Sequence, residues 1–335
     1  MSQEILIPRP LPQLLSIVIP LFNEEAMVPL LKETLTSFTA GLPCPYEVIL
    51  VNDGSSDGTL PALLRWASER PELAVIALSR NFGHQAAATA GLDRARGEAI
   101  VLMDADLQDP PQVIHEMLRQ YANGYDVVYA QRKSRLGERW FKRAAAWAFY
   151  RLMRLAVDQR LPPDTGDFRL VSRQCLEVLR EMREQHRFLR GMVAWVGFPQ
   201  IGVSITRPPR AAGFTKYPLH KMFRLAWTAV VSFSPTPLRA VFAMGFVVGL
   251  FGLAAGLYSA AALLVGLPVV RGWTSLMLTQ CVIGSFILLS IGVAGEYIAK
   301  IYEESKNRPL YVVDRLRSHD ARRGETVAPK EDSHE

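Results

Sequence analysis

Short apolar runs alternate with longer amphipathic stretches along the first 130 residues of the chain. Runs of about five residues rich in Val, Ile and Leu suit strands buried on both faces of a parallel sheet. The stretches between them have the length and spacing of helices, so the pattern predicts an α/β fold with crossover helices. The expected strands are 15–20, 47–51, 74–78, 99–103 and 126–129, and the expected helices are 25–39, 60–69, 85–94 and 111–122.

Two long runs without charge follow in the C-terminal third, at residues 241–265 and 276–295. At ~1.5 Å per residue each run approaches or exceeds the ~30 Å hydrocarbon core of a bilayer. The link between them is short, so the two runs predict a transmembrane hairpin. Lys and Arg flank both outer ends, and the positive-inside rule then places both termini in the cytoplasm. The polar, proline-rich first 13 residues do not resemble a secretory signal.

The charge distribution adds an anionic partner to this picture. The 335-residue chain carries a net charge of +6, and its segment 185–295 contains no Asp or Glu but eight Lys or Arg between 187 and 239. Such a stretch faces lipid head groups or phosphorylated ligands, or is simply a solvated basic surface. Amphipathic spacing at 219–230 predicts a helix lying in the membrane interface, and 139–155 is either a second such helix or an ordinary core helix.

Glycines at 245, 249, 252 and 256 share one face of the first span. A face of small residues lets helices approach closely. We therefore expect a homo-oligomer, with a tetramer among the forms considered, although packing against the second span alone explains the same pattern. The three distant cysteines indicate no disulfide framework and no metal site.

Polar loops follow the first, second and fourth expected strands, where ligands bind in open α/β sheets. Asp104 and Asp106 are two carboxylates beside each other at a strand end, an arrangement that favours Mg²⁺ or Mn²⁺. Asp53 is expected to bond a base or ribose, and Asp57 to cap the next helix. His84 has no partner visible in the sequence and receives no catalytic role. Neither a dinucleotide-binding G-x-G-x-x-G nor a P-loop is present.

These motifs resemble, in order and spacing, those of the polyprenyl-phosphate glycosyltransferases, which include dolichol-phosphate mannose synthase-like enzymes and bactoprenol glucosyltransferases. The similarity covers roughly residues 15–312. The matching pieces are S-I-V-I-P-L-F-N-E-E at 16–25, V-N-D-G-S-S-D-G-T at 51–59, S-R-N-F-G-H-Q-A-A at 79–87, D-A-D-L-Q-D-P-P at 104–111, T-G-D-F-R-L at 165–170, R-F-L-R-G at 187–191, R-P-P-R-A-A-G-F-T-K-Y at 207–217 and G-E-Y-I-A-K-I-Y-E-E-S-K-N-R-P at 295–309.

The resemblance implies a nucleotide-diphospho-sugar transferase domain of the GT-A type, Rossmann-like, with interfacial helices and a two-helix membrane hairpin. It implies the following site residues: Pro20, Phe22, Glu24, Asp53, Asp104, Ala105 and Arg132 for the nucleotide sugar; Asp104, Asp106 and Gln108 for the metal; Arg207, Arg210 and Lys216 for phosphate or lipid; and Asp167 and Asp106 for catalysis. Asn52 stands where many relatives have Asp, which leaves the base of the donor open.

The expected reaction is inverting, metal-dependent transfer of one sugar, from a UDP-sugar in preference to a GDP-sugar, to undecaprenyl phosphate at the cytoplasmic face of a bacterial inner membrane. The product would supply cell-envelope glycan or lipopolysaccharide modification, and no nucleic acid is involved. Because a phosphate monoester is already largely dianionic at pH 7, Asp167 is expected to orient the acceptor or stabilise charge on the sugar rather than remove a proton.

Two alternatives stay open at this point. A processive polysaccharide synthase shares the D-x-D but normally has Q-x-x-R-W, which is absent from this sequence, and more spans. A membrane scaffold or lipid carrier would need neither a D-x-D nor polar loops that converge at the strand ends. The expected organisation is a tail at 1–14, a catalytic domain at 15–206, a juxtamembrane segment at 207–237, two spans at 238–265 and 275–299, and a cytoplasmic tail at 301–335, charged and flexible beyond about residue 313.

Overall fold

A computed structural model of the chain describes residues 6–132, 165–205 and 273–320, together with residues 238 and 241–248 and single positions between 250 and 265. The chain divides into two compact units. The sheet unit comprises Met1–Ala144, Arg160–Thr215 and Arg308–Glu335, and the helical unit comprises Ala145–Gln159 and Lys216–Asn307.

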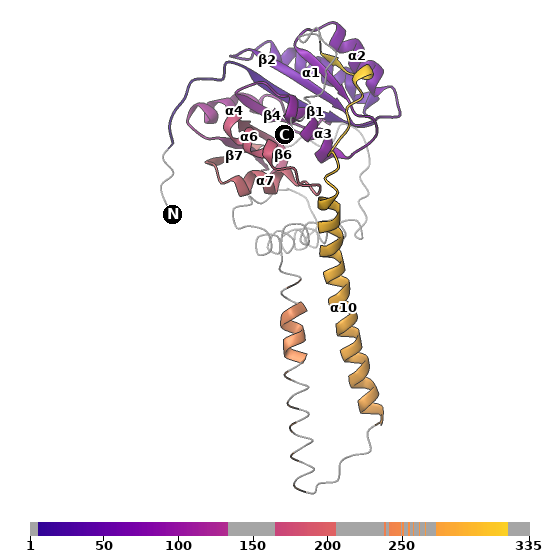
Figure 1. The fold of residues 1–335 in the computed structure, drawn as a ribbon. Helices are drawn as coiled ribbons and strands as arrows, with labels where there is room; N and C mark the ends of the chain where they lie inside the picture. Colours follow the sequence, from indigo (N-terminus) through magenta and orange to yellow (C-terminus); the bar gives the residue numbers. More distant parts are fainter. Residues whose placement is uncertain are drawn as a thin grey trace, which may run out of the picture. The chain divides into compact units, whose positions relative to one another are not determined.

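The described part of the sheet unit is built on one eight-stranded mixed sheet, in the order β7-β5-β6-β4-β1-β2-β3-β8 (Figure 1). The strands are β1 Leu15–Leu21, β2 Tyr46–Asn52, β3 Leu73–Ala77, β4 Ala99–Leu102, β5 Val127–Arg132, β6 Thr165–Ser172, β7 Gln200–Ile205 and β8 His319–Asp320. Strands β4, β1, β2 and β3 are parallel, whereas β6 and β8 run antiparallel to their neighbours. All five strands expected from the apolar runs are present, and the predicted α/β class is confirmed.

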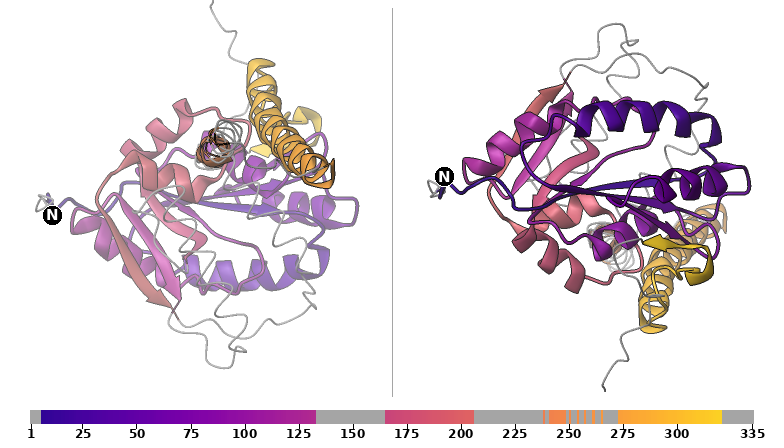
Figure 2. Two further views of the ribbon diagram at one scale, coloured as in Figure 1. Left: turned by 90° about the horizontal axis from the view of Figure 1, so that it is seen from below. Right: turned by 90° about the horizontal axis from the view of Figure 1, so that it is seen from above.

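Helices cover both faces of this sheet (Figure 2). The helices of the sheet unit are α1 Val28–Thr39, preceded by a 3-10 turn at Glu25–Met27, α2 Thr59–Ser68, α3 His84–Arg94, α4 Val113–Ala122, α6 Arg173–Glu181 and α7 Leu189–Val196. Apolar residues of α1, α2 and α4 form one core cluster with the sheet, and those of α3, α6 and α7 form a second. The four helices expected from the sequence are found within a few residues of their predicted bounds.

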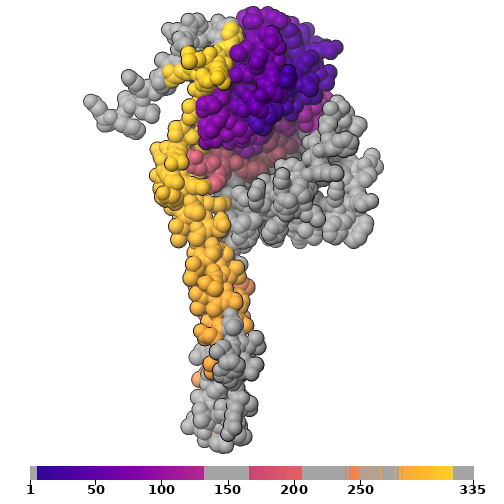
Figure 3. Space-filling model, turned by 90° about the vertical axis from the view of Figure 1, so that its right-hand side faces the viewer, coloured from indigo at the N-terminus to yellow at the C-terminus, as the bar shows by residue number. Residues whose placement is uncertain are grey.

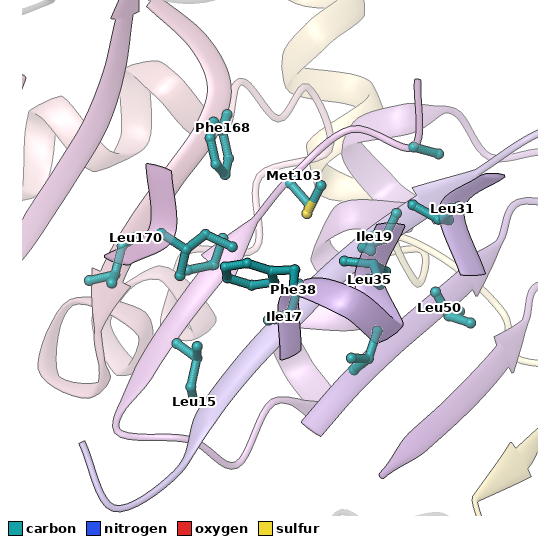
Figure 4. Packing of buried hydrophobic residues seen from close by; sticks show 14 of the residues in the cluster. Leu15, Ile17, Ile19, Leu31, Leu35, Phe38, Leu50, Met103, Phe168 and Leu170 are labelled. Carbon is teal, nitrogen blue, oxygen red and sulfur yellow. The ribbon is translucent and has the colours of Figure 1, made fainter. Parts of the chain in front are cut away.

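Strand β1 shows how alternation divides the two cores. Ile17 and Ile19 pack into the cluster of α1, α2 and α4, while Val18 between them belongs to the cluster of α3, α6 and α7. All three side chains are fully buried. Figure 4 shows Ile17 and Ile19 among Leu35, Phe38 and other members of the first cluster. A strand buried on both faces appears in the sequence as a continuous apolar run, which explains why β1 was predictable.

The C-terminal segment differs from expectation. A flexible tail was predicted beyond about residue 313, but residues 311–320 lie along the edge strand β3. The amide of Ser79 donates to the carbonyl of Val312 at 2.9 Å, and that of Asp314 donates to the carbonyl of Ala77 at 2.8 Å. In Figure 3 this segment (yellow) lies against the purple N-terminal half. It covers backbone groups that an exposed edge strand would leave unpaired.

The described part of the helical unit contains α10, Trp273–Ser305. Its portion Val282–Ser305 is long and apolar enough to cross a membrane. Residues 241–248 of the first expected span are helical. The structure describes the rest of that span only at single positions. The expected interfacial helices at 139–155 and 219–230, and three of the four glycines of the small-residue face, lie outside the described residues.

Candidate functional site

The loops that follow β1 and β2 are tied together by hydrogen bonds. The amide of Asn23 donates to Ser55 Oγ at 3.0 Å, and the Asn23 side chain accepts from the amide of Ser56 at 2.9 Å. Asp57 accepts from the amides of Thr59 and Glu25, at 3.0 and 3.2 Å, so it bonds the first residue of α2, but the N-cap residue of this helix is Gly58 and not Asp57 as predicted. Asn23 has a positive φ of 54°, a conformation that Asn tolerates better than most residues. Two of the three expected strand-end loops therefore form one rigid rim.

Asp53, at the end of β2, is only 3% exposed and organises the loop that leads into α3. One carboxylate oxygen accepts from the amide of Phe82 at 2.8 Å. The other accepts from the amide of Gly83 at 2.9 Å and from the Asn81 side chain at 3.1 Å. Burial raises the pKa of Asp53, with these amide bonds acting in the opposite direction. The structure thus gives Asp53 a loop-holding role that the sequence did not indicate, and its contact with a base or ribose stays a prediction.

The acidic pair follows β4 directly. Asp104 is partly exposed and Asp106 accepts the amide of Gln108 at 3.1 Å, across Leu107, whose φ is +52°. Burial raises the pKa of Asp104, His84 lowers it, and the carboxylates of Asp167, Asp106 and Asp109 raise it further. The ionised form of Asp104 is therefore disfavoured in the folded protein, mainly by burial.

Asp167 lies on β6, the strand next to β4, and is held from several sides. Arg190 Nε donates to Asp167 Oδ1 at 2.6 Å, and Gln85 Nε2 donates to Asp167 Oδ2 at 3.3 Å. Burial alone raises the pKa of Asp167, but hydrogen bonds from His84 and Arg190, with the guanidinium charges nearby, hold it well below its usual range. The side chain is an ionised acceptor at neutral pH.

His84, the first residue of α3, joins the two acidic groups. Its Nε2 lies 3.4 Å from Asp167 Oδ2 and 3.5 Å from Asp104 Oδ1. The hydrogen bond to Asp167 raises the pKa of His84, and burial acts in the opposite direction. The sequence analysis assigned no role to this residue because its partners come from distant strands. His84, Gln85 and Arg190 are thus site residues that the motifs contained but local reasoning did not identify.

The other expected site residues are distributed as follows. Pro20, Ala105 and Gln108 are buried, and Pro20 lies near the end of β1. Phe22 is 46% exposed, and the amide of Glu24 donates to Thr59 Oγ1. Arg132 is the last residue of β5, and its side chain lies outside the described residues. Arg207, Arg210 and Lys216 also lie outside the described residues. Their roles in binding stay predictions.

The donor set fits a hard divalent cation of the kind expected. Within the described residues, no group of three or more His, Cys, Asp or Glu side chains is arranged to hold a metal. Mg²⁺ and Mn²⁺ sites that work on phosphates commonly use one or two carboxylates, with waters and substrate oxygens completing the shell. Asp104 and Asp106 supply those carboxylates, and a cation there would relieve the charge crowded around Asp104.

The profile of glycosyl transferase family 2 matches residues 16–180. The chain is 43% identical over 303 residues to the uncharacterized glycosyltransferase YkcC of Bacillus subtilis, covering 90% of this chain and 93% of that one. It is 36% identical over 299 residues to the bactoprenol glucosyl transferase of Shigella phage SfV, covering 89% and 97%. Among solved structures, mannosyl-3-phosphoglycerate synthase from Rubrobacter xylanophilus matches 68% of this chain and 74% of its own, at 18% identity and a TM-score of 0.45.

The chain is a glycosyltransferase, and it belongs to glycosyltransferase family 2. This membership confirms the resemblance drawn from the motifs. It favours an enzyme over the non-enzymatic scaffold that the sequence analysis left open.

Proposed function

We propose that the protein transfers a single sugar from a nucleotide-diphosphate sugar to polyprenyl phosphate, with inversion, at the cytoplasmic face of a bacterial inner membrane. A UDP-sugar is the proposed donor, and Mg²⁺ or Mn²⁺ the proposed cofactor. The observation that carries the proposal is the joining of Asp104 and Asp167 through His84, at 3.5 and 3.4 Å. One acid belongs to the predicted metal motif and the other to the predicted acceptor side, so donor and acceptor groups would meet at this point.

Three further observations support it. Relatives named bactoprenol glucosyl transferase match nearly the full length of the chain, and bactoprenol is a polyprenyl lipid. Helix α10 contains a portion apolar enough to cross a membrane. An acceptor with a long prenyl chain is insoluble in water, so an enzyme that uses it benefits from a membrane anchor.

On the donor side, the chain's own residues bind and orient. Asp104 and Asp106 would hold the cation, which when bound acts as a Lewis acid on the leaving diphosphate. The linked loops after β1 and β2 give the nucleoside a rigid rim, because their amides and side chains are already bonded to each other. A rigid site needs little reorganisation when charge develops on the leaving group.

On the acceptor side, Asp167 orients and stabilises. Both of its oxygens already accept hydrogen bonds, from Arg190 at 2.6 Å and from Gln85 at 3.3 Å. The acceptor is a phosphate monoester with a second pKa of about 6, so at pH 7 it is already largely ionised and needs no base. A fixed carboxylate beside the sugar can instead stabilise the positive charge that develops on the ring.

This role gives a prediction for Asp167→Asn. We expect turnover to fall by about 100-fold, well below the ~10⁴-fold upper range of general-base catalysis, with the pH profile of the wild type retained. The measurement is kcat against pH for the full chain in detergent. Asp126→Asn is a matched control, because Asp126 is also a buried acid paired with an arginine, Arg9, but lies outside the site. A loss far above 10⁴-fold, together with a pH profile that follows one carboxylate, would assign Asp167 as a true base.

The proposed function is tested by incubating membranes that contain the protein with radiolabelled polyprenyl phosphate and a panel of UDP- and GDP-sugars, with and without Mn²⁺. We expect one sugar to be added to the lipid, only with the metal present. Chains of several sugars would favour the processive synthase instead, and absence of any lipid product with all donors would reject the proposal.

A further inference from the structure

A cavity of about 500 Å³ lies beside His84 in the sheet unit, and apart from His84 and Gln85 its lining residues have no part in the proposed mechanism. Its walls come from three places that are far apart in the sequence: the β3–α3 loop with the start of α3, the segment 185–187, and the segment 308–310. Each wall contributes one arginine. We call it the arginine pocket, defined by Arg80, Arg187 and Arg308 with His84 and His186.

The lining of the arginine pocket has one sign of charge. Three arginines and two histidines belong to its lining, and among the described residues no Asp or Glu lines it. The first turn of α3, an 11-residue helix, adds backbone amides at the positive end of the helix dipole. Gly83, at the entrance to this turn, has open space where a side chain would extend. The cavity is therefore suited to a compact anion.

The pocket is held in place by contacts on every side. Arg80 stacks on the Phe82 ring at 4.0 Å, and Arg187 donates to the carbonyls of Met182 and Leu179 at the end of α6. These contacts fix two of the cationic groups before any ligand arrives.

The third wall is anchored by two hydrogen bonds. Gln185 Nε2 donates to the carbonyl of Arg308 at 2.5 Å, and the Tyr311 hydroxyl donates a hydrogen bond to Asp93 at 2.7 Å. Within the described part of the chain the Arg308 side chain has no hydrogen bond or ion pair of its own. Its guanidinium is thus available to a ligand while its backbone is anchored.

The location of the pocket identifies the kind of anion. His84 belongs both to the pocket and to the acidic cluster, since its Nε2 lies 3.5 Å from Asp104. A phosphate dianion that approaches Asp104 and Asp167 is repelled by them, and a cationic surface at the approach would offset that repulsion. Arg308 also follows the last residue of α10, Ser305, by only three positions, a span of at most about 10 Å of chain.

We propose that the arginine pocket binds the phosphate monoester of the polyprenyl acceptor and presents it to the reaction site beyond His84. This inference rests on the proposed function and names the residues that would recognise its second substrate. Arg308 acts as a binding residue for the acceptor, and the donor is held elsewhere, at the loops after β1, β2 and β4.

The test compares Arg308→Gln with two variants in the full chain, purified in detergent. Arg308→Lys keeps the positive charge, and Arg315→Gln removes an exposed cation of the same segment that does not line the pocket. Binding is measured by titration calorimetry with farnesyl phosphate, with farnesol, which has the same tail without the phosphate, and with inorganic phosphate. Transfer assays then give KM for lipid acceptor and for donor separately.

We expect Arg308→Gln to weaken farnesyl phosphate binding and to raise the KM for the acceptor by about tenfold, the loss of one charged hydrogen bond. The donor KM and farnesol binding should not change, Arg308→Lys should recover most of the affinity, and Arg315→Gln should behave as the wild type. A change in donor KM instead of acceptor KM would overturn the proposal, as would unchanged farnesyl phosphate binding, including the case in which only inorganic phosphate binding is lost.

This design separates the two ideas. If the wild type makes no lipid-linked sugar, the proposed function fails, while the calorimetry still reports whether the pocket recognises a phosphate monoester. If the lipid product forms but Arg308→Gln leaves acceptor binding unaffected, only the assignment of the pocket fails.

Discussion

Replacement of Asp104 or Asp106 by Asn is expected to lower the rate of sugar transfer at least ~1000-fold. Each substitution removes one of the two carboxylates that would hold the cation on the leaving diphosphate, and electrostatic stabilisation of this kind typically accounts for 10²–10³-fold or more per group. The measurement is kcat of the full chain at saturating Mn²⁺ and donor. Glu116→Gln, on α4 outside the site, is the matched control because it removes the same charge from the same unit.

Stability measurements distinguish this loss from misfolding. The raised pKa of Asp104 means that its ionised form is disfavoured in the folded protein: burial and the nearby acids outweigh the opposite effect of His84. A carboxyl with a raised folded-state pKa reduces stability at neutral pH, so Asp104→Asn should leave the metal-free Tm equal or higher. Mn²⁺ should raise the Tm of the wild type but not of the variant. An inactive variant with a lowered metal-free Tm, or a fully active variant, contradicts the assignment.

The strands β1 to β5 could be predicted because each is defined by its own residues. Ile17, Val18 and Ile19 are apolar without interruption since both faces of β1 are covered, and the polar residues then begin where the strand ends. Parallel strands with crossover helices place those ends at one edge of the sheet. For that reason the sequence alone predicts that Asp53 and the acidic pair share one site, and this stays a prediction.

Strand β6 could not be predicted in the same way. It runs antiparallel between β4 and β5 and includes Gly166, Asp167 and Arg169 in place of a continuous apolar run. Its insertion brings Asp167 to His84 and Arg190, which lie 83 positions before and 23 positions after it in the chain. No local pattern encodes a meeting of this kind, although the family resemblance did single out Asp167.

The C-terminal segment shows a second limit. Residues 311–320 form a short segment with several charges, and they are held by the edge of β3 through main-chain bonds and by packing of Tyr311 and Val313 against the second core cluster. Strand addition of this type depends in part on main-chain bonds to a distant strand, which the local side-chain pattern does not record. The arginine pocket depends on the same contacts, and it was therefore invisible from the sequence even though its arginines stood in the quoted motifs.

Glu47 offers a test of what stabilises the sheet itself. It is 3% exposed, and it accepts from Ser16 Oγ at 2.7 Å and from the backbone and guanidinium of Arg96 at 2.8 to 3.0 Å. Gly97 in turn donates its amide to Ser16 Oγ at 2.8 Å. One carboxylate therefore joins β2, β1 and the turn before β4. Burial by itself raises the pKa of Glu47, but the hydrogen bonds from Ser16 and Arg96, with the charge of Arg96, lower it below its ordinary value of 4.5.

We expect Glu47→Gln to destabilise the protein by about 2–4 kcal/mol at pH 7, because the amide leaves buried donors of this network without an ionised acceptor. A carboxylate whose folded-state pKa is depressed stabilises the protein fully above its unfolded-state pKa, and loses that contribution as the pH falls through the folded-state value. The difference in Tm between wild type and variant should therefore be largest near pH 7 and shrink below pH ~4.5. Thermal unfolding of both full chains in detergent, measured between pH 7 and pH 4, checks this.

Ser16→Ala should show a smaller loss of stability with little pH dependence, since it removes one hydrogen bond and no charge. A Glu47→Gln variant as stable as the wild type at pH 7 would mean that the network contributes to the fold far less than its burial and hydrogen bonds indicate.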